Sequence, residues 1–215
     1  AKLMYGAYEP INSNYPGSTW ENPDDEKVKY DPQQAVKLLS DAGYTGRDGQ
    51  GRLTRNGVPL ALELIYPAQD SEKFLTVYQE DLRKVGITLN LRLVTFETMV
   101  KLVDERQFGM VSSAYTASLF PNPETSWLSS FADQKNNNNI TGFKNAKVDQ
   151  LIAQYDLAYD VPQRVNIIRQ IDKLITDEHT WIFEWYAPNH RIVFWNRFGM
   201  PKGELTRIGD FMDMP

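Results

Sequence analysis

The sequence predicts an α/β fold whose core is a βαβαβ unit between residues 60 and 115. Residues 60–66, 87–94 and 108–115 are rich in apolar side chains, and the second run alternates as a half-buried strand does. The two stretches between these runs carry apolar residues at helical spacing. Strands joined by helices pair in parallel through right-handed crossovers, so we expect an open sheet with ligands beyond its carboxyl ends.

Polar residues and a glycine mark the ends of the two core helices. Asp70 is predicted to cap the start of the first helix and Gly86 its end, and Thr95 is predicted to cap the second. The apolar positions are Phe74, Val77, Tyr78, Leu82 and Val85 in the first helix and Met99, Leu102 and Val103 in the second.

The chain before the core is expected to begin as an irregular arm, residues 1–30, because it has no helical period and holds three prolines. The expected anchors of the arm are Tyr5, Tyr8 and Trp20. Asp31 and Pro32 then start a helix that stops at Gly43. Residues 44–57 contain several glycines at turn positions and predict a hairpin with two turns.

The chain after the core is predicted to be helical and then to end in aromatic strands. Asp160 is predicted to cap the start of the helix at 162–176, as in a capping box. The expected elements are a short helix at 124–131, helices at 147–159 and 162–176, and strands at 181–186 and 191–195.

Composition excludes several classes of function. A hydrophobic share of 41% with 24% charged residues is typical of a soluble globular protein. The net charge of −5, spread along the chain, does not favour nucleic acid or an anionic membrane surface. The absence of cysteine excludes disulfides and thiolate metal sites. The first residues lack the apolar core of a signal peptide, and we expect a fragment or mature segment of a longer protein.

No catalytic or metal-binding constellation is evident. His179 and His190 have no second ligand at metal spacing, and no phosphate loop or nucleophile elbow is present. Glu184 lies between two aromatic residues, and alternation places it on the opposite face, where we expect it to be exposed or ion-paired. The sequence therefore predicts a protein without enzymatic activity, cofactor or metal.

Uncharged aromatic and amide-rich segments near the strand ends indicate a binding surface instead. Broad aromatic faces with polar partners suit a ligand held by its shape and backbone. The aromatic candidates are Tyr115, Phe120, Trp127, Phe143, Trp185 and Tyr186. The alternative for Trp127, Phe143 and Trp185 is burial in the core.

The order of several motifs resembles family 5 of the extracellular solute-binding proteins, the oligopeptide- and dipeptide-binding proteins of ABC importers. The similar segments are residues 30–44, 48–51, 60–65, 85–91, 108–111, 141–152 and 181–195. Residues 195–201 resemble the branch that takes up longer peptides and microcin-type conjugates. The resemblance covers about residues 5–201 and lies more in the shared order of the motifs than in any one of them.

This resemblance implies the C-terminal lobe of a type II periplasmic-binding-protein fold with a mixed sheet. Residues 1–199 are then the ligand-binding lobe, and residues 200–215 begin the return to a missing N-terminal lobe. Such a protein is periplasmic, or extracellular and membrane-tethered. It closes on an oligopeptide or peptide-like ligand and passes it to an ABC permease in the membrane, with no role for nucleic acid.

The resemblance also adds polar residues to the expected binding surface. In the family, the residues after the third strand approach the ligand backbone and its amino end; here these are residues 114–118, with Thr116 and Ser118 as candidates. Relatives that bind short peptides place an aspartate there, whereas this chain has Tyr115-Thr-Ala-Ser118 and no carboxylate.

Two other functions remain open at this stage. One is a ligand-sensing domain of a regulator, which a basic helix-turn-helix in the missing sequence would favour. The other is a hydrolase on the same α/β sheet, which an essential His179 or His190 would favour.

Overall fold

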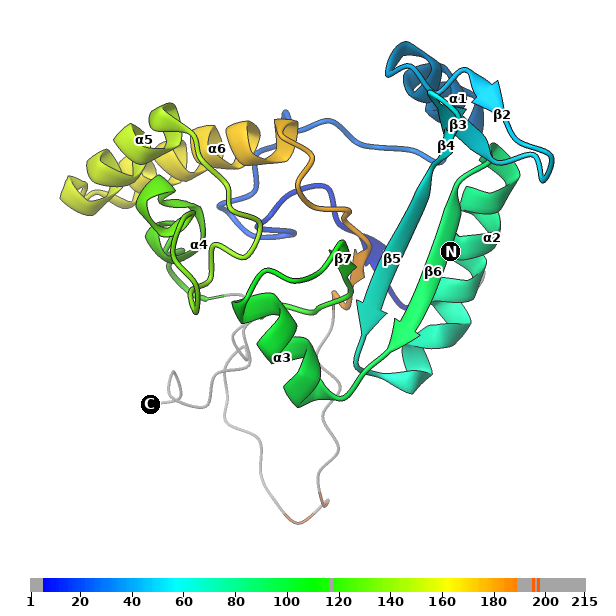
Figure 1. Ribbon diagram of the computed structural model, residues 1–215. Helices are drawn as coiled ribbons and strands as arrows, with labels where there is room; N and C mark the ends of the chain where they lie inside the picture. Colours follow the sequence, from blue (N-terminus) through cyan, green and yellow to red (C-terminus); the bar gives the residue numbers. More distant parts are fainter. Residues whose placement is uncertain (1–5, 117, 189–194, 196, 198–215) are drawn as a thin grey trace. The chain divides into compact units, whose positions relative to one another are not determined.

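The computed structural model describes residues 6–116, 118–188, 195 and 197, and the chain forms two compact units (Figure 1). The first unit consists of Ala1–Lys27, Thr116–Ser129 and Phe143–Pro215. The second unit consists of Val28–Tyr115 and Ser130–Gly142. Each unit has its own hydrophobic core and is described separately below.

A three-stranded parallel sheet forms the centre of the second unit. Its strands are β5 (Ala61–Tyr66), β6 (Thr88–Leu93) and β7 (Met110–Val111), in the order β6-β5-β7. Helix α2 (Glu72–Val85) connects β5 to β6, and α3 (Phe96–Asp104) connects β6 to β7. The predicted βαβαβ core is therefore confirmed. The third strand has two residues instead of the eight expected from residues 108–115.

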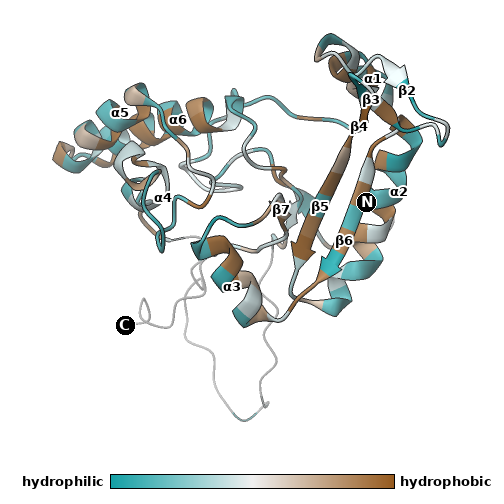
Figure 2. Cartoon of the chain, in the orientation of Figure 1, coloured by the Kyte–Doolittle hydropathy of each residue, from teal (hydrophilic) through white to brown (hydrophobic). Residues whose placement is uncertain are grey.

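The central strand is more apolar than the edge strand β6, as Figure 2 shows. Strand β5 has a neighbour on both sides, and its last three residues are buried. Among the described residues, strand β6 has a neighbour on one side only, and it alternates less strictly in burial than its sequence predicts, because Leu93 is exposed. The core of this unit is formed by Leu64, Tyr66, Leu75 and Leu89.

The ends of the core helices follow the predicted caps with one exception. Gly86 ends α2 in the left-handed conformation, with φ +92°. Thr95 caps α3 through its side chain, which accepts from the backbone N–H of Thr98 at 3.2 Å. Asp70 does not cap α2; it lies within a single 3₁₀ turn, η2 (Gln69–Ser71), and Ser71 precedes the helix without a side-chain bond.

The remaining part of the second unit begins with α1 (Pro32–Asp41). The side chain of Asp31 accepts from the N–H of Gln34 at 2.9 Å, which confirms the predicted start of this helix. The predicted two-turn hairpin is also confirmed. It forms an antiparallel sheet of β2 (Gly46–Arg47), β3 (Leu53–Arg55) and β4 (Val58–Pro59), in the order β2-β3-β4.

The first unit is mainly helical. Its elements are β1 (Glu9–Pro10), α4 (Glu124–Trp127), α5 (Ala146–Leu157), α6 (Val161–Asp177) and β8 (Trp185–Tyr186), and a 3₁₀ turn η3 (Ser129–Phe131) follows α4 in the chain. Asp160 caps α6 as predicted, accepting from the N–H of Gln163 at 3.0 Å. The strand expected at 181–186 is limited to β8, which pairs with β1. Residues 191–194 of the last expected strand lie outside the described residues.

The N-terminal arm is anchored more deeply than its sequence predicts. Trp20 is part of the buried core of the first unit, whereas Tyr5 lies outside the described residues. The fully buried carboxylate of Asp172 on α6 accepts from the hydroxyl of Ser13 at 2.5 Å and from the backbone N–H of Asn14 at 3.0 Å. The arm is thus attached to α6 through a buried polar network.

Among the described residues, we find no helix with the length and apolar character that crossing a membrane requires.

Candidate functional site

The segment after β7 is the exposed part of the predicted binding surface. The N–H of Ser112 donates to the carbonyl of Ile65 at 2.9 Å, and the chain then leaves the sheet. Tyr115 is 67% exposed, and Thr116 and Ser118 are exposed as well. The surface offered here consists of hydroxyl groups and one aromatic ring, with no carboxylate.

The phenol of Tyr115 remains neutral at physiological pH. Partial burial of the hydroxyl raises the pKa of Tyr115, although a hydrogen bond with Ser113 acts in the opposite direction. A neutral phenol both donates and accepts hydrogen bonds, so it can pair with either polar group of a peptide unit.

Phe120 is the second exposed aromatic residue of this segment. Half of its surface is exposed, and its ring contacts the buried indole of Trp20 edge-on, with the ring centroids 5.9 Å apart. Sequence reasoning placed Phe120 on the binding surface but assigned Trp20 only as an anchor of the arm. No sequence signal connects Trp20 with Phe120. The indole of Trp20 donates to the carbonyl of Leu119, the residue before Phe120, which is 99 positions away in the sequence.

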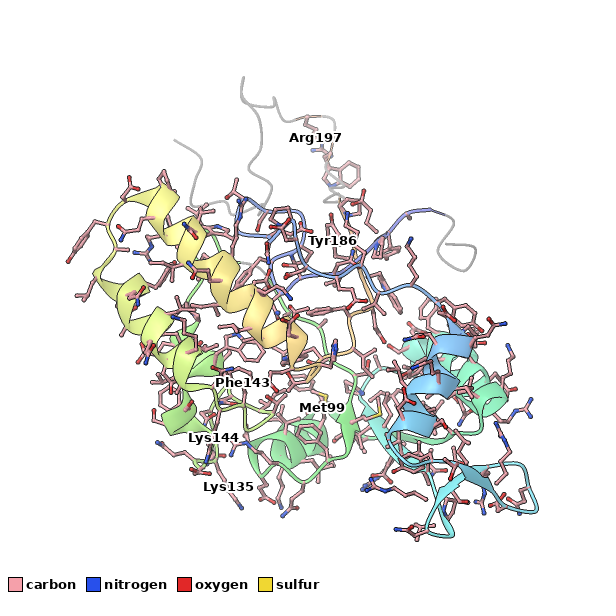
Figure 3. The ribbon with its side chains drawn as sticks, turned by 90° about the horizontal axis from the view of Figure 1, so that it is seen from above. Met99, Lys135, Phe143, Lys144, Tyr186 and Arg197 are labelled. Atoms are coloured by element: carbon pink, nitrogen blue, oxygen red, sulfur yellow. The ribbon has the colours of Figure 1, made fainter. Side chains whose placement is uncertain are left out.

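Trp127 and Phe143 lie in the core of the first unit. They are 6% and 5% exposed, and their rings meet edge-on with centroids 5.3 Å apart. Trp127 also contacts Trp181 at 6.1 Å, and both buried rings pack with residues of α5 and α6 (Figure 3 labels Phe143). Burial leaves these two side chains little surface for a ligand, so the core alternative describes them better than the binding assignment.

Trp185 and Tyr186 form β8 and are partly buried. Tyr186 pairs with Glu9 in the register of β1, and its hydroxyl donates to Glu9 Oε2 at 2.8 Å (Figure 3 labels Tyr186). Trp185 pairs with Pro10. The strand holds both side chains in defined positions, and their partial exposure is compatible with the predicted role in binding.

The described residues contain no group of three or more histidine, aspartate or glutamate side chains arranged to hold a metal ion. His179 is exposed just after α6, and His190 lies outside the described residues. Glu184 is exposed as a residue, as predicted, but burial of its carboxyl group raises its pKa, which the sequence did not indicate. The candidate surface offers apolar area and hydrogen-bonding groups.

Comparison with known proteins matches residues 1–138 to the model for bacterial extracellular solute-binding proteins, family 5 Middle. The probable peptide-binding protein YejA of Agrobacterium fabrum is 26% identical over 181 residues, which are 83% of this chain and 30% of that protein. The oligopeptide-binding protein AppA of Bacillus subtilis is 26% identical over 214 residues, 96% of this chain and 38% of that protein. The chain thus spans about a third of the length of these relatives.

Solved structures share the fold. AppA from Bacillus subtilis in complex with a nonapeptide superposes with a TM-score of 0.76 at 24% identity. NikZ from Campylobacter jejuni in complex with Ni(L-His) superposes with a TM-score of 0.75 at 18% identity. Each comparison covers 86% of this chain and 38% of the other. The predicted α/β fold class is therefore confirmed, and the chain belongs to family 5 of the bacterial extracellular solute-binding proteins.

Proposed function

We propose that this chain supplies one lobe of the substrate-binding component of an ABC importer, which holds a peptide-like ligand in a cleft between two lobes. Membership of family 5 supports a binding function. Peptide-like ligands are supported by the relatives YejA, named as a probable peptide-binding protein, and AppA, solved with a nonapeptide.

The observation that carries the proposal is the uncharged, exposed segment at the carboxyl end of β7. Along this segment of the chain, Tyr115, Thr116 and Ser118 carry exposed hydroxyl groups, and Phe120 carries an exposed aromatic ring. Hydroxyl groups can pair with the N–H and C=O groups that every peptide has, while the ring contacts side chains without demanding a charge. Such a surface binds peptides by their backbone and does not require an ionised partner.

We propose the same domain organisation as the one expected from the sequence. Residues 1–199 form the ligand-binding lobe, and residues 200–215 lead toward the rest of the protein. The complete protein acts in the periplasm, or outside the cell tethered to the membrane, and passes its ligand to an ABC permease. Its function is to bind and release a ligand without a chemical reaction.

Native mass spectrometry of the full-length protein, purified without added ligand, tests the proposal. We expect co-purifying peptides, and we expect calorimetry after their removal to show that they rebind. A matched titration with the nickel–histidine complex distinguishes peptides from the ligand of NikZ. Binding of the metal complex and of no peptide would overturn the assignment to peptide-like ligands.

A substitution pair tests the role of the exposed segment in the same protein. Ser118→Ala removes a hydroxyl that we place at the ligand backbone, and we expect peptide affinity to fall about threefold to tenfold. Ser40→Ala, at an exposed position of α1, is the matched control and should leave affinity unchanged.

A further inference from the structure

The backbone on both sides of Phe120 is held by side chains that are distant in the sequence. The indole Nε1 of Trp20 donates to the carbonyl oxygen of Leu119 at 3.1 Å. The hydroxyl of Tyr155 donates to the carbonyl oxygen of Pro121 at 2.8 Å. Both donors belong to the buried core of the first unit, so the carbonyl groups that flank Phe120 have fixed orientations.

The ring of Phe120 is supported on part of its surface and open on the rest. It meets the indole of Trp20 with ring planes at 65°. On α6, the guanidinium carbon of Arg164 lies 5.9 Å from the centroid of the Phe120 ring and 3.9 Å from that of Tyr155. The exposed half of the ring lies next to Leu119, which is also exposed.

Arg164 is itself fixed, so its contact with the ring is a stable one. Its Nη1 donates to the carbonyl oxygen of Ala158 at 3.2 Å, and its cation stacks closely on Tyr155. A guanidinium over an aromatic ring is attracted to the negative face of that ring. Three separate parts of the chain, the N-terminal arm, α5 and α6, thus converge on the segment from 119 to 121.

An exposed ring on a fixed backbone is suited to binding. A mobile loop loses conformational entropy when a ligand orders it, and this loss weakens affinity. Here the loop is already ordered by the core, so the ligand contact carries less of that penalty. A ring that served only to fill the core would be covered, as Trp127 and Phe143 are.

We propose that Trp20 and Tyr155 are positioning residues for a ligand subsite formed by Phe120 and Leu119, and that this subsite takes an apolar side chain of a peptide. The inference rests on the proposed function, because it assigns a part of that binding surface and the class of side chain bound there. Aromatic and aliphatic side chains fit because both subsite residues offer apolar area.

Calorimetry on the full-length protein tests the subsite with a set of short peptides. The parent peptide is all alanine, and in the others a single position, varied along the peptide, carries Phe, Leu or Asp. In Phe120→Ala, we expect affinity for the best Phe and Leu peptides to fall about fivefold to tenfold, and affinity for the Ala and Asp peptides to change less than about twofold. Phe96→Ala, which removes an exposed ring at the start of α3, is the matched control and should change none of these affinities.

A second variant tests the positioning role. Tyr155→Phe removes the hydroxyl that holds Pro121 and keeps the aromatic packing, so we expect a selective loss of about threefold for the same peptides. Without ligand, hydrogen exchange of the amides at 118–120 should become faster in this variant. Tyr159→Phe makes the same chemical change at an exposed position and should affect neither measurement. If Tyr155→Phe does not fold, Trp20→Phe removes the other donor and tests the same role.

The outcomes separate this inference from the proposed function. A wild-type protein that binds none of the peptides would overturn the proposed function and the subsite together. A wild type that binds, with a Phe120→Ala variant that loses affinity for all peptides equally or for none, would overturn the subsite alone. Unchanged affinity and unchanged hydrogen exchange in Tyr155→Phe would overturn the positioning role.

Discussion

The guanidinium group of Arg106 donates twice to the carbonyl oxygen of Asn139, from Nε at 3.2 Å and from Nη2 at 2.7 Å. Its Nη1 donates to the carbonyl of Ala132 at 2.5 Å, and its Nη2 also donates to the carbonyl of Phe131 at 2.9 Å and to Oδ1 of Asn137 at 3.4 Å. Arg106 lies just beyond α3 with φ +51°, a conformation that bulky residues rarely adopt. Arg106 therefore bonds several points of the asparagine-rich loop of the second unit, whose described residues 132–142 contain no helix or strand.

Replacing Arg106 by lysine should reduce the free energy of unfolding by about 2 to 3 kcal/mol, because an ammonium group cannot reach several carbonyls in different directions. Urea denaturation of the purified protein measures this change. Arg92→Lys is the matched control, since Arg92 makes one exposed ion pair with Glu63 at 3.3 Å. The control should change stability by less than about 0.5 kcal/mol, and an equal effect of the two substitutions would contradict the role of Arg106.

Gly86 is required both for its backbone conformation and for the space around it. An added Cβ would lie 2.6 Å from Arg47 Nη1 and 3.1 Å from the backbone nitrogen of Leu53, which donates to the Gly86 carbonyl at 2.7 Å. Gly86→Ala should therefore reduce the free energy of unfolding by about 3 kcal/mol. Gly57→Ala has a similar φ of +77° but open space, so it should cost only about 1 kcal/mol. Equal losses in thermal or urea unfolding would show that crowding is unimportant at Gly86.

Asp25 should make the stability of the protein depend on pH. The residue is 6% exposed, its Oδ2 has no hydrogen-bond partner within the described residues, and it faces the buried Asp172 carboxylate. The pKa of Asp25 is raised to about 7; burial is the larger cause, and the negative charge of Asp172 is the next. The cation of Lys173 acts on Asp25 in the opposite direction, as does the hydrogen bond from Asn22, and the phenol of Tyr15 lies near Asp172.

The sign of this dependence follows from the raised pKa. The folded protein keeps the proton up to about pH 7, whereas the unfolded chain releases it near the ordinary value of 3.8. The contribution to stability is therefore complete below about pH 4 and is lost as the pH rises through about 7. When the pH rises from about 5 to about 8, the free energy of unfolding of the wild type should fall by about 2 kcal/mol more than that of Asp25→Asn.

Urea unfolding at both pH values measures the difference, with Asp24→Asn, at the exposed neighbouring position, as the control. The control should follow the wild type. If Asp25→Asn has the same pH dependence as the wild type, Asp25 is not the titrating group.

Trp185 has a fixed place beside Pro10 in the β1–β8 pair and is partly exposed. In the full-length two-lobed protein, Trp185→Ala should weaken peptide binding by about tenfold while lowering the melting temperature by only a few degrees, about 2 to 4 °C. Calorimetry and thermal unfolding measure the two effects, and Trp195→Ala, at an exposed position, is the control. Unchanged affinity with a lowered melting temperature would assign Trp185 to the core.

Local chemistry made several elements of this fold predictable. Asp31, Thr95 and Asp160 each accept from a backbone N–H three positions later, so these caps can be recognised from a few neighbouring residues. Gly86 is recognisable for the same reason, because only the residue and its neighbours determine the left-handed end of α2.

The length of the third strand depends on its partner. Residues 108–115 have the composition of a strand, but β7 pairs with β5 only through Leu64 and Ile65. Strand β5 ends at Tyr66, and Pro67, which has no N–H to donate, follows it. The pairing of β7 therefore stops near Ser112, and the segment that carries Tyr115 is left exposed.

The sequence by itself determined the parallel βαβαβ core, the helix ends at Asp31, Gly86, Thr95 and Asp160, and the order of motifs that indicates the family, because these depend on spacing along the chain. Tertiary structure alone decided which aromatic residues are core and which are surface. Trp127 and Phe120 are seven positions apart in similar sequence surroundings, yet α5 and α6 cover the first and leave half of the second exposed. Burial depends on contacts between distant segments, and periodicity within one segment does not encode them.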